Sequence, residues 1–181
     1  MSADTKISKF LSLILRHKPE SIGLQLDAAG WADVAMLIEN ASKAGVHLTS
    51  GKIAAIVATS NKQRFALSDD GSRIRANQGH SVTVDLGLPP KEPPELLYHG
   101  TAHRNLSSIR GKGIVSMNRT LVHLSNNLDT AIAVGKRHGQ PVVLTIQAGK
   151  MHRDGFLFYL SENGVWLTDH VPVKYIEFQS C

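Results

Sequence analysis

The feature that most constrains this chain is a proline-rich stretch near its middle, Pro89-Pro90-Lys91-Glu92-Pro93-Pro94. Four prolines in six residues stiffen the backbone toward an extended polyproline geometry. The stretch therefore predicts a linker over residues 89–94 between two lobes, residues 1–88 and residues 95–181. A chain of 181 residues is long enough for both lobes to bury apolar cores.

The first lobe is predicted to begin with three helices. Its apolar residues recur at the i, i+3, i+4, i+7 spacing of an amphipathic helix. Asp33 and Thr49 are suited to cap the second and third helices, Pro19 ends the first and Gly45 ends the second. The residues expected to face the core are Ile7, Phe10, Leu11, Ile14, Val34, Leu37, Ile38, Ala41, Ile53, Ile56 and Val57.

A β-hairpin is predicted after the helices. Residues 64–67 and 73–76 flank the turn sequence Ser68-Asp69-Asp70-Gly71. Three helices followed by a hairpin is the order of a winged helix, a fold that binds nucleic acid in some proteins and other proteins elsewhere. We also expect a further strand over 82–86.

The second lobe is predicted to be rich in strands, which makes the whole chain α+β. A strand over 96–98 ends in His99-Gly100-Thr101, where the glycine allows a ligand to approach the backbone and the threonine can bind a ribose or phosphate oxygen. Further strands are expected over 122–125, 142–146, 156–160, 165–168 and 175–178, with helices over 105–110 and 128–138 and a tight turn at 162–164.

Composition narrows the class of protein. The chain has 20 Lys and Arg against 15 Asp and Glu, a net charge of +5 that fits an anionic partner and equally fits ordinary solubility. Cys181 is the only cysteine, which excludes a disulfide framework. With no signal pattern and no apolar run of roughly 18 residues, we expect a cytoplasmic monomer that does not bind membranes.

Several common kinds of site find no support in the sequence. It has no cysteine pair and no carboxylate cluster at ligand spacing, so no metal is expected. Glycine-rich phosphate loops are also absent. What remains is a set of Arg and His residues near segment ends, which could grip a phosphate. Taken singly, each is better explained as a solvated side chain or as part of a charged helix end.

Six ordered stretches shift that balance. They are Leu15-Arg16-His17-Lys18-Pro19-Glu20, Arg64-Phe65, Ile74-Arg75-Ala76-Asn77-Gln78-Gly79-His80-Ser81, Tyr98-His99-Gly100-Thr101, Val122-His123-Leu124-Ser125 and Asn163-Gly164-Val165-Trp166-Leu167-Thr168. Together they span nearly the whole chain, which resembles the NAD-dependent RNA 2′-phosphotransferase family. The resemblance implies a winged-helix RNA lobe and an ADP-ribosyltransferase-like NAD lobe.

The resemblance also implies a reaction. Members take an internal 2′-phosphate from RNA, as left at a spliced tRNA junction. The phosphate attacks the nicotinamide ribose of NAD, giving RNA-2′-phospho-ADP-ribose. The ribose 2″-hydroxyl then attacks phosphorus, releasing RNA with a 2′-hydroxyl and ADP-ribose 1″,2″-cyclic phosphate. Val165 would stand where many ADP-ribosyltransferases have a catalytic glutamate. A phosphate is already anionic and needs no base.

The same resemblance assigns roles to particular residues, with the catalytic cleft between the lobes. The catalytic residues would be Arg16, His17, Arg64 and Arg119, and Arg119 would stabilise charge in the second step. The residues expected to bind NAD are His99, Gly100, Thr101, Gly113, Ile114, His123 and Ser125. Those expected to contact the RNA-side phosphate are Gln78, Gly79, His80 and Ser81.

Three other functions stay open at this point. The protein could be an ADP-ribosyltransferase that stops after the first step and modifies a nucleic-acid phosphate end. It could be a winged-helix regulator that binds nucleic acid and senses NAD, or a protein-interaction module without catalysis. Production of the cyclic phosphate distinguishes the first alternative, and release of nicotinamide distinguishes the last.

Overall fold

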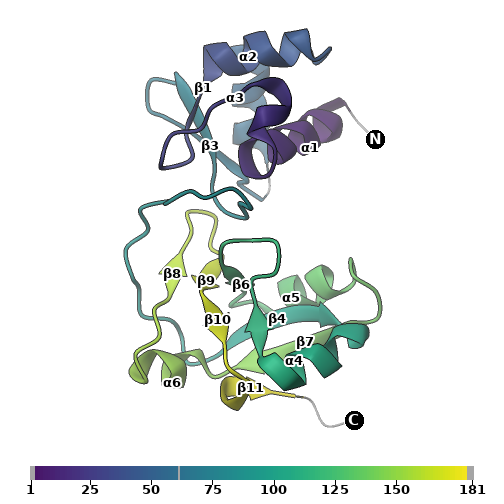
Figure 1. Ribbon diagram of the computed structural model, residues 1–181, viewed down its shortest axis with the longest axis vertical. Helices are drawn as coiled ribbons and strands as arrows, with labels where there is room; N and C mark the ends of the chain where they lie inside the picture. The colour runs from purple at the N-terminus through teal and green to yellow at the C-terminus, as the bar shows by residue number, and fades with distance from the viewer. Residues whose placement is uncertain (1–2, 61, 179–181) are drawn as a thin grey trace. The chain divides into compact units, whose positions relative to one another are not determined.

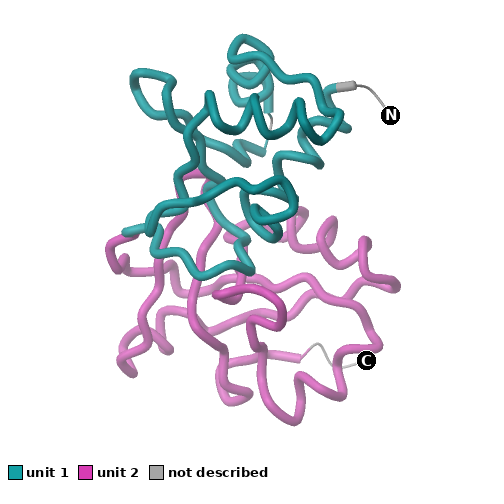
Figure 2. The backbone as a smooth tube through the Cα atoms, turned by 45° about the horizontal axis from the view of Figure 1, so that its top comes forward, with its two compact units in different colours: residues 1–87 teal, residues 88–181 magenta. Residues whose placement is uncertain are grey.

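The computed structural model describes residues 3–60 and 62–178, so Cys181 lies outside the described residues. The chain forms two compact units, Met1–Gly87 and Leu88–Cys181 (Figure 2). Each unit has a separate apolar core. Both contain helices and small antiparallel sheets, which confirms the α+β class. No helix in the described ranges is long and apolar enough to cross a membrane.

The described residues of unit 1 form three α-helices, labelled in Figure 1, and a three-stranded sheet in the order β1-β3-β2. Its elements are α1 Ala3–Arg16, the 3₁₀ helix η1 Pro19–Ile22, β1 Ala32–Asp33, α2 Val34–Lys43, α3 Ser50–Thr59, β2 Phe65–Leu67 and β3 Arg73–Ala76. All three predicted helices and the hairpin are therefore confirmed. The additional strand β1 pairs with β3, which places the start of α2 beside the hairpin.

Local capping explains where the helices begin. The Asp33 side chain accepts a hydrogen bond from the Met36 amide at 2.8 Å, and Thr49 accepts from the Lys52 amide at 3.1 Å. Gly45, just past α2, has a φ of +77°, the left-handed conformation that commonly follows a helix end. These bonds satisfy amides that lack partners within the helix.

The strand predicted over 82–86 is wrong. The segment is not in a sheet, although its residues alternate between half-buried and exposed as a strand would. The Asp85 amide donates to the Ala28 carbonyl at 2.8 Å, and Val84 packs beside Gly30. The alternating burial therefore comes from an extended segment that lies on unit 1. It is not a β-strand, because a strand also needs a hydrogen-bonded partner strand along its length.

Unit 2 contains two three-stranded sheets and a two-stranded pair, with orders β11-β7-β4, β6-β9-β8 and β10-β5 (Figure 1). Its strands are β4 Leu97–Ala102, β5 Ile114–Val115, β6 Val122–Leu124, β7 Pro141–Ile146, β8 Tyr159–Leu160, β9 Trp166–Thr168, β10 His170–Val171 and β11 Ile176–Glu177. Its helices are η2 His103–Asn105, α4 Leu106–Lys112, α5 Leu128–Gly135, α6 Ala148–Arg153 and η3 Val173–Tyr175.

Most predicted elements of unit 2 are present, with shifted bounds. β4 does not end before the His-Gly-Thr motif but continues through it, pairing with β7 from Leu97 opposite Ile146 to Ala102 opposite Pro141. Residues 156–158 precede β8 instead of extending it, and α6, β5 and β10 were not predicted. The proline-rich stretch is anchored on this unit, since the Lys91 amide donates to the Phe158 carbonyl at 2.8 Å.

Helix α5 lies directly on β4 and β7, and Gly100 makes this packing possible. A Cβ atom on Gly100 would overlap the backbone carbonyl of Ala131 in α5 and would lie 3.0 Å from the Gly135 nitrogen. The missing side chain therefore makes room for a helix on the face of the sheet, which is a different reason for the glycine from the ligand approach expected from sequence.

We predict that Gly100→Ala lowers the free energy of unfolding by about 3 kcal/mol, because the added methyl group displaces α5. The measurement is urea unfolding followed by far-UV circular dichroism. Gly111→Ala is the matched control, since a Cβ atom there meets nothing within 4 Å and the position is an exposed helical one. The control should gain up to about 1 kcal/mol. Equal midpoints for the two variants would contradict this packing argument.

Candidate active site

In unit 1, the loop after the hairpin is tied to the C-terminal end of α1. The Arg16 carbonyl accepts hydrogen bonds from the amides of Ser81 at 2.8 Å and Val82 at 3.3 Å. The last carbonyls of a helix have no partner within it. The His17 Nδ1 atom also lies 3.0 Å from the Ser81 Oγ atom. Residues predicted as catalytic and as RNA-binding are thus brought together, although 64 positions separate the two members of that last pair.

The Arg16 guanidinium is held against the strand that follows Arg64. Its Nη2 atom donates to the Arg64 carbonyl at 3.3 Å, and its Cζ atom lies 5.8 Å from the centre of the Phe65 ring. A Cβ atom on Gly79 would lie 3.5 Å from the Arg16 Nη1 atom, and Gly79 has a φ of +87°. Gly79 therefore offers bare backbone to the guanidinium in a conformation that other residues adopt only under strain.

Asn77 fixes the segment that carries Arg64. Its backbone amide donates to the Arg64 carbonyl at 3.0 Å, and the Nδ2 atom of its side chain donates to the Gln63 carbonyl at 2.7 Å. Gln63 has a φ of +39°, an unfavourable value that these bonds help to maintain. Asn77 is 6% exposed, and sequence reasoning did not single it out.

His80 is buried among these positive charges. Its side chain is 1% exposed. Burial, followed by the charges of Arg16, His17 and Arg75, lowers its pKa to about 4. The imidazole is therefore neutral near pH 7, so it adds no charge beneath the arginines. Within the unit it packs beside Gly30, where its Nε2 atom would lie 3.5 Å from an added Cβ atom.

Arg75 is a residue of this region that the sequence did not single out as a site residue. Its guanidinium Cζ atom lies 4.7 Å from the centre of the Trp31 ring, and its charge acts on His80. The position lies within one of the six motifs used for the resemblance, so the sequence did contain a signal for it. Stacking on tryptophan holds a guanidinium in place without neutralising it.

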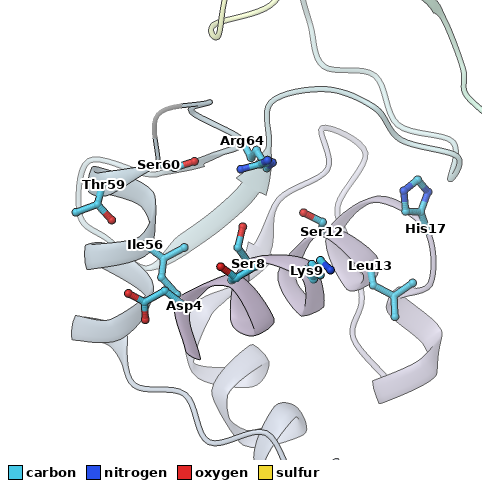
Figure 3. A pocket seen from close by; sticks show the side chains of 11 residues that line it. Asp4, Ser8, Lys9, Ser12, Leu13, His17, Ile56, Thr59, Ser60 and Arg64 are labelled. Atoms are coloured by element: carbon cyan, nitrogen blue, oxygen red, sulfur yellow. The ribbon is translucent and has the colours of Figure 1, made fainter. Parts of the chain in front are cut away.

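A groove on unit 1 opens beside the predicted catalytic residues. It encloses about 550 Å³ and runs between α1 on one side and α3 with the start of β2 on the other (Figure 3). His17 and Arg64 both line it. Gln78, also predicted to contact RNA, is half-buried in the loop that follows the hairpin.

In unit 2, two histidines predicted to bind NAD are connected through the backbone. The His99 Nδ1 atom donates to the His123 carbonyl at 3.1 Å, and the His123 Nδ1 atom donates to the Leu121 carbonyl at 3.0 Å. Burial lowers the pKa of His99, the bond to His123 opposes that shift, and the charges of Arg119 and His138 add to the lowering. A neutral His99 with Nδ1 donating leaves Nε2 as a hydrogen-bond acceptor.

The other residues predicted to bind NAD have structural partners in unit 2. Thr101 is 4% exposed and accepts from Asn105 Nδ2 at 3.1 Å, and Ser125 donates to the Asn127 carbonyl at 3.0 Å. Ile114 belongs to the apolar core. A Cβ atom on Gly113 would overlap the Val171 carbonyl, and its φ is +75°. Each of these residues thus makes hydrogen bonds or packing contacts that support the structure of unit 2.

Arg119 follows β5 in a surface loop of unit 2. Partial burial and then the charge of Arg137 lower its pKa, although an arginine remains charged near neutral pH. The charge of Arg119 acts on His99 in turn, so a neutral acceptor lies within the electrostatic reach of a cationic group. Such a set is complementary to ribose hydroxyls beside a pyrophosphate. Among residues 3–60 and 62–178, no cluster of three or more metal-ligating side chains occurs.

We predict that the buried neutral His80 makes stability depend on pH. Its pKa is about 6.5 when unfolded and about 4 when folded. The stabilisation is therefore complete above pH 6.5 and is lost as the pH falls toward 4. Between pH 7 and pH 5, the wild type should lose about 2 kcal/mol more unfolding free energy than His80→Gln, measured by urea titration at each pH. Equal losses in both proteins would show that His80 does not titrate in this way.

Comparison with known proteins identifies the family. A family model described as RNA 2′-phosphotransferase, Tpt1 / KptA family, matches residues 2–170. A probable RNA 2′-phosphotransferase of Acaryochloris marina is 58% identical over 169 residues, covering 93% of both chains. Its counterpart in Agrobacterium fabrum is 58% identical over 172 residues, covering 95% of this chain and 92% of the relative. The protein of that name in Flavobacterium johnsoniae is 55% identical over 174 residues, covering 96% of each. This chain therefore belongs to the Tpt1 / KptA family of RNA 2′-phosphotransferases.

Proposed function

We propose that this enzyme transfers an internal 2′-phosphate from a tRNA-like RNA to NAD, which is consumed as a co-substrate. The observation that carries the proposal is that one loop of unit 1, after the hairpin, is bonded to the Arg16 and Arg64 carbonyls and to the His17 ring. Two guanidinium groups and an imidazole form a set of donors suited to a phosphate dianion. The order of helices and strands in unit 1 supports a winged helix, and the strand-rich unit 2 supports an ADP-ribosyltransferase-like lobe.

In the first step, a 2′-phosphate oxygen forms a bond to the anomeric carbon of the nicotinamide ribose. The bond to nicotinamide breaks, and nicotinamide leaves with the electron pair. The nucleophile is already an anion near neutral pH, so the step needs no general base. Arg16, His17 and Arg64 are proposed to bind and orient this phosphate.

In the second step, the 2″-hydroxyl oxygen of the ribose attacks phosphorus and the bond to the RNA 2′-oxygen breaks. The hydroxyl proton is lost and the RNA 2′-oxygen gains one, which leaves RNA with a 2′-hydroxyl and ADP-ribose 1″,2″-cyclic phosphate. Arg119 is proposed to stabilise the negative charge that builds up here. His17 can carry the proton, because an imidazole can both accept and donate one near neutral pH. Its contact with Ser81 is made by Nδ1, so the proton would be carried at Nε2.

For NAD, His99 is the strongest candidate among the predicted residues. Its Nδ1 atom is used by the His123 carbonyl, so Nε2 can accept a hydrogen bond from a ribose hydroxyl. Arg119 acts on His99 electrostatically and can balance the negative pyrophosphate. We propose that Gly100, Thr101, Gly113, Ile114 and Ser125 shape this site through packing, since each is engaged within unit 2.

Alanine substitutions of Arg16, His17, Arg64 or Arg119 should each lower kcat/KM by about 10²- to 10³-fold, the usual effect of removing a positioned charged donor. The assay incubates the protein with NAD and an oligonucleotide that carries one internal 2′-phosphate, and measures loss of that phosphate. Lys43→Ala, which removes an exposed ion pair with Glu39 on α2, is the control and should keep wild-type activity. Full turnover in the Arg64→Ala protein would contradict the proposal.

The two steps can be separated by mass spectrometry of the RNA. Because Arg119 is proposed to act in the second step, Arg119→Ala should accumulate RNA-2′-phospho-ADP-ribose, whereas Arg64→Ala should slow its formation. The wild type should release ADP-ribose 1″,2″-cyclic phosphate. A wild type that releases nicotinamide but forms no cyclic phosphate would instead be an ADP-ribosyltransferase that stops after the first step.

A further inference from the structure

The groove of unit 1 extends well beyond the predicted catalytic residues. Ser8, Lys9 and Ser12 lie along its α1 wall, and His17 lies past the end of the same helix (Figure 3). From Ser8 to His17 the chain advances about 14 Å at 1.5 Å per helical residue. A single phosphate bound by His17 and Arg64 would leave most of this length unfilled.

The α1 wall of the groove carries small hydroxyl side chains, which project little from the helix. Ser8 and Ser12 are four residues apart and half-buried, at the edge of the helix face that carries the buried residues Leu11 and Leu15. Serine favours a helix interior less than alanine does. Longer residues such as leucine or lysine would favour the helix more and would fill the groove, so the serines make the open space possible at some expense of helix stability.

On the opposite wall, a buried hydroxyl offers a further polar group. The Ser60 Oγ atom is buried and has no hydrogen-bond partner among the described residues, and Ser60 lines the groove. A buried polar atom without a partner is unfavourable. A ligand in the groove that presents oxygen atoms would satisfy it.

The charges of the groove favour an anion. Lys9, His17 and Arg64 line it, and the one acidic lining residue, Asp4, is paired with Lys52 at 2.6 Å. Ammonium and hydroxyl groups spaced along a helix match a chain that alternates phosphates with ribose oxygens. Contacts of this kind position a nucleic acid without reading its bases.

We propose that this groove binds the single RNA strand that flanks the 2′-phosphorylated nucleotide, with Lys9 contacting a phosphate and Ser8, Ser12 and Ser60 contacting backbone oxygens. The inference rests on the proposed function, because the catalytic end of the groove sets where the strand begins. It predicts that the enzyme recognises RNA beyond the reacting nucleotide through its backbone, and on one side of that nucleotide only.

The test compares oligonucleotides that carry one internal 2′-phosphate and differ in length. A 2′-phosphorylated dinucleotide is extended by four nucleotides on its 5′ side or on its 3′ side. For the wild type, one extension should lower KM and the other should have little effect. Lys9→Ala should then raise KM about tenfold for the favoured long substrate relative to the dinucleotide. It should also make the salt dependence of binding shallower by about one phosphate contact.

The matched control is Lys6→Ala. Lys6 lies on the same helix and is exposed, but it does not line the groove. Its removal changes the net charge equally and should not alter the ratio of KM values. An equal effect of both substitutions would mean that only the overall charge matters, which would overturn the proposal.

Ser12→Leu separates blocking from unfolding. Leucine favours helix more than serine, so the melting temperature should stay the same or rise while KM for the favoured long substrate increases. Unchanged KM ratios in both Lys9→Ala and Ser12→Leu would overturn the groove assignment and leave the proposed reaction intact. Failure of the wild type to process even the dinucleotide and both long substrates would instead overturn the proposed function itself.

Discussion

The capping of α1 by a distant loop is the interaction on which the site of unit 1 depends. The Arg16 carbonyl, left without a partner at the helix end, accepts from the amides of Ser81 and Val82. The same loop reaches back through Asn77 to the Arg64 carbonyl. The need to pair these two carbonyls therefore brings the end of α1 and the start of β2 to the same loop. The side chains of the residues at both places are positioned as a result. Main-chain bonds thus fix the two backbone segments that carry the cationic side chains.

Neutral groups beneath these cations make their convergence tolerable. Like charges held close together repel each other, and every further charge placed below them raises that cost. Gly79 contributes backbone alone against the Arg16 guanidinium, and His80 is buried in its uncharged form. An aromatic face at Phe65 adds a favourable contact for the same arginine. The unit thus concentrates positive charge at its surface over an uncharged base, which is a suitable electrostatic design for binding a phosphate.

The sequence predicts best what neighbouring residues decide. The helices of unit 1 follow from periodic apolar residues and from caps at Asp33 and Thr49, both of which act within one turn. The strand over 82–86 was wrong because its partner would have to come from elsewhere in the chain. The burial of His80 could not be predicted either, since it depends on packing beside Gly30, fifty positions away. The motifs identified the family, but they did not separate residues that touch a ligand from residues that hold the fold.

That last distinction differs between the two units. In unit 1, the groove is lined by His17 and Arg64. The Arg16 guanidinium lies beside Gly79 in the loop after the hairpin. In unit 2, Gly100 is required by the contact of α5 with β4, and Gly113 by the contact with Val171. The glycine of the His-Gly-Thr motif is therefore explained by the packing of α5 on β4, without any contact to a ligand. The chemical contribution of unit 2 then falls on the groups whose polar atoms remain available, above all the Nε2 atom of His99 and the guanidinium of Arg119.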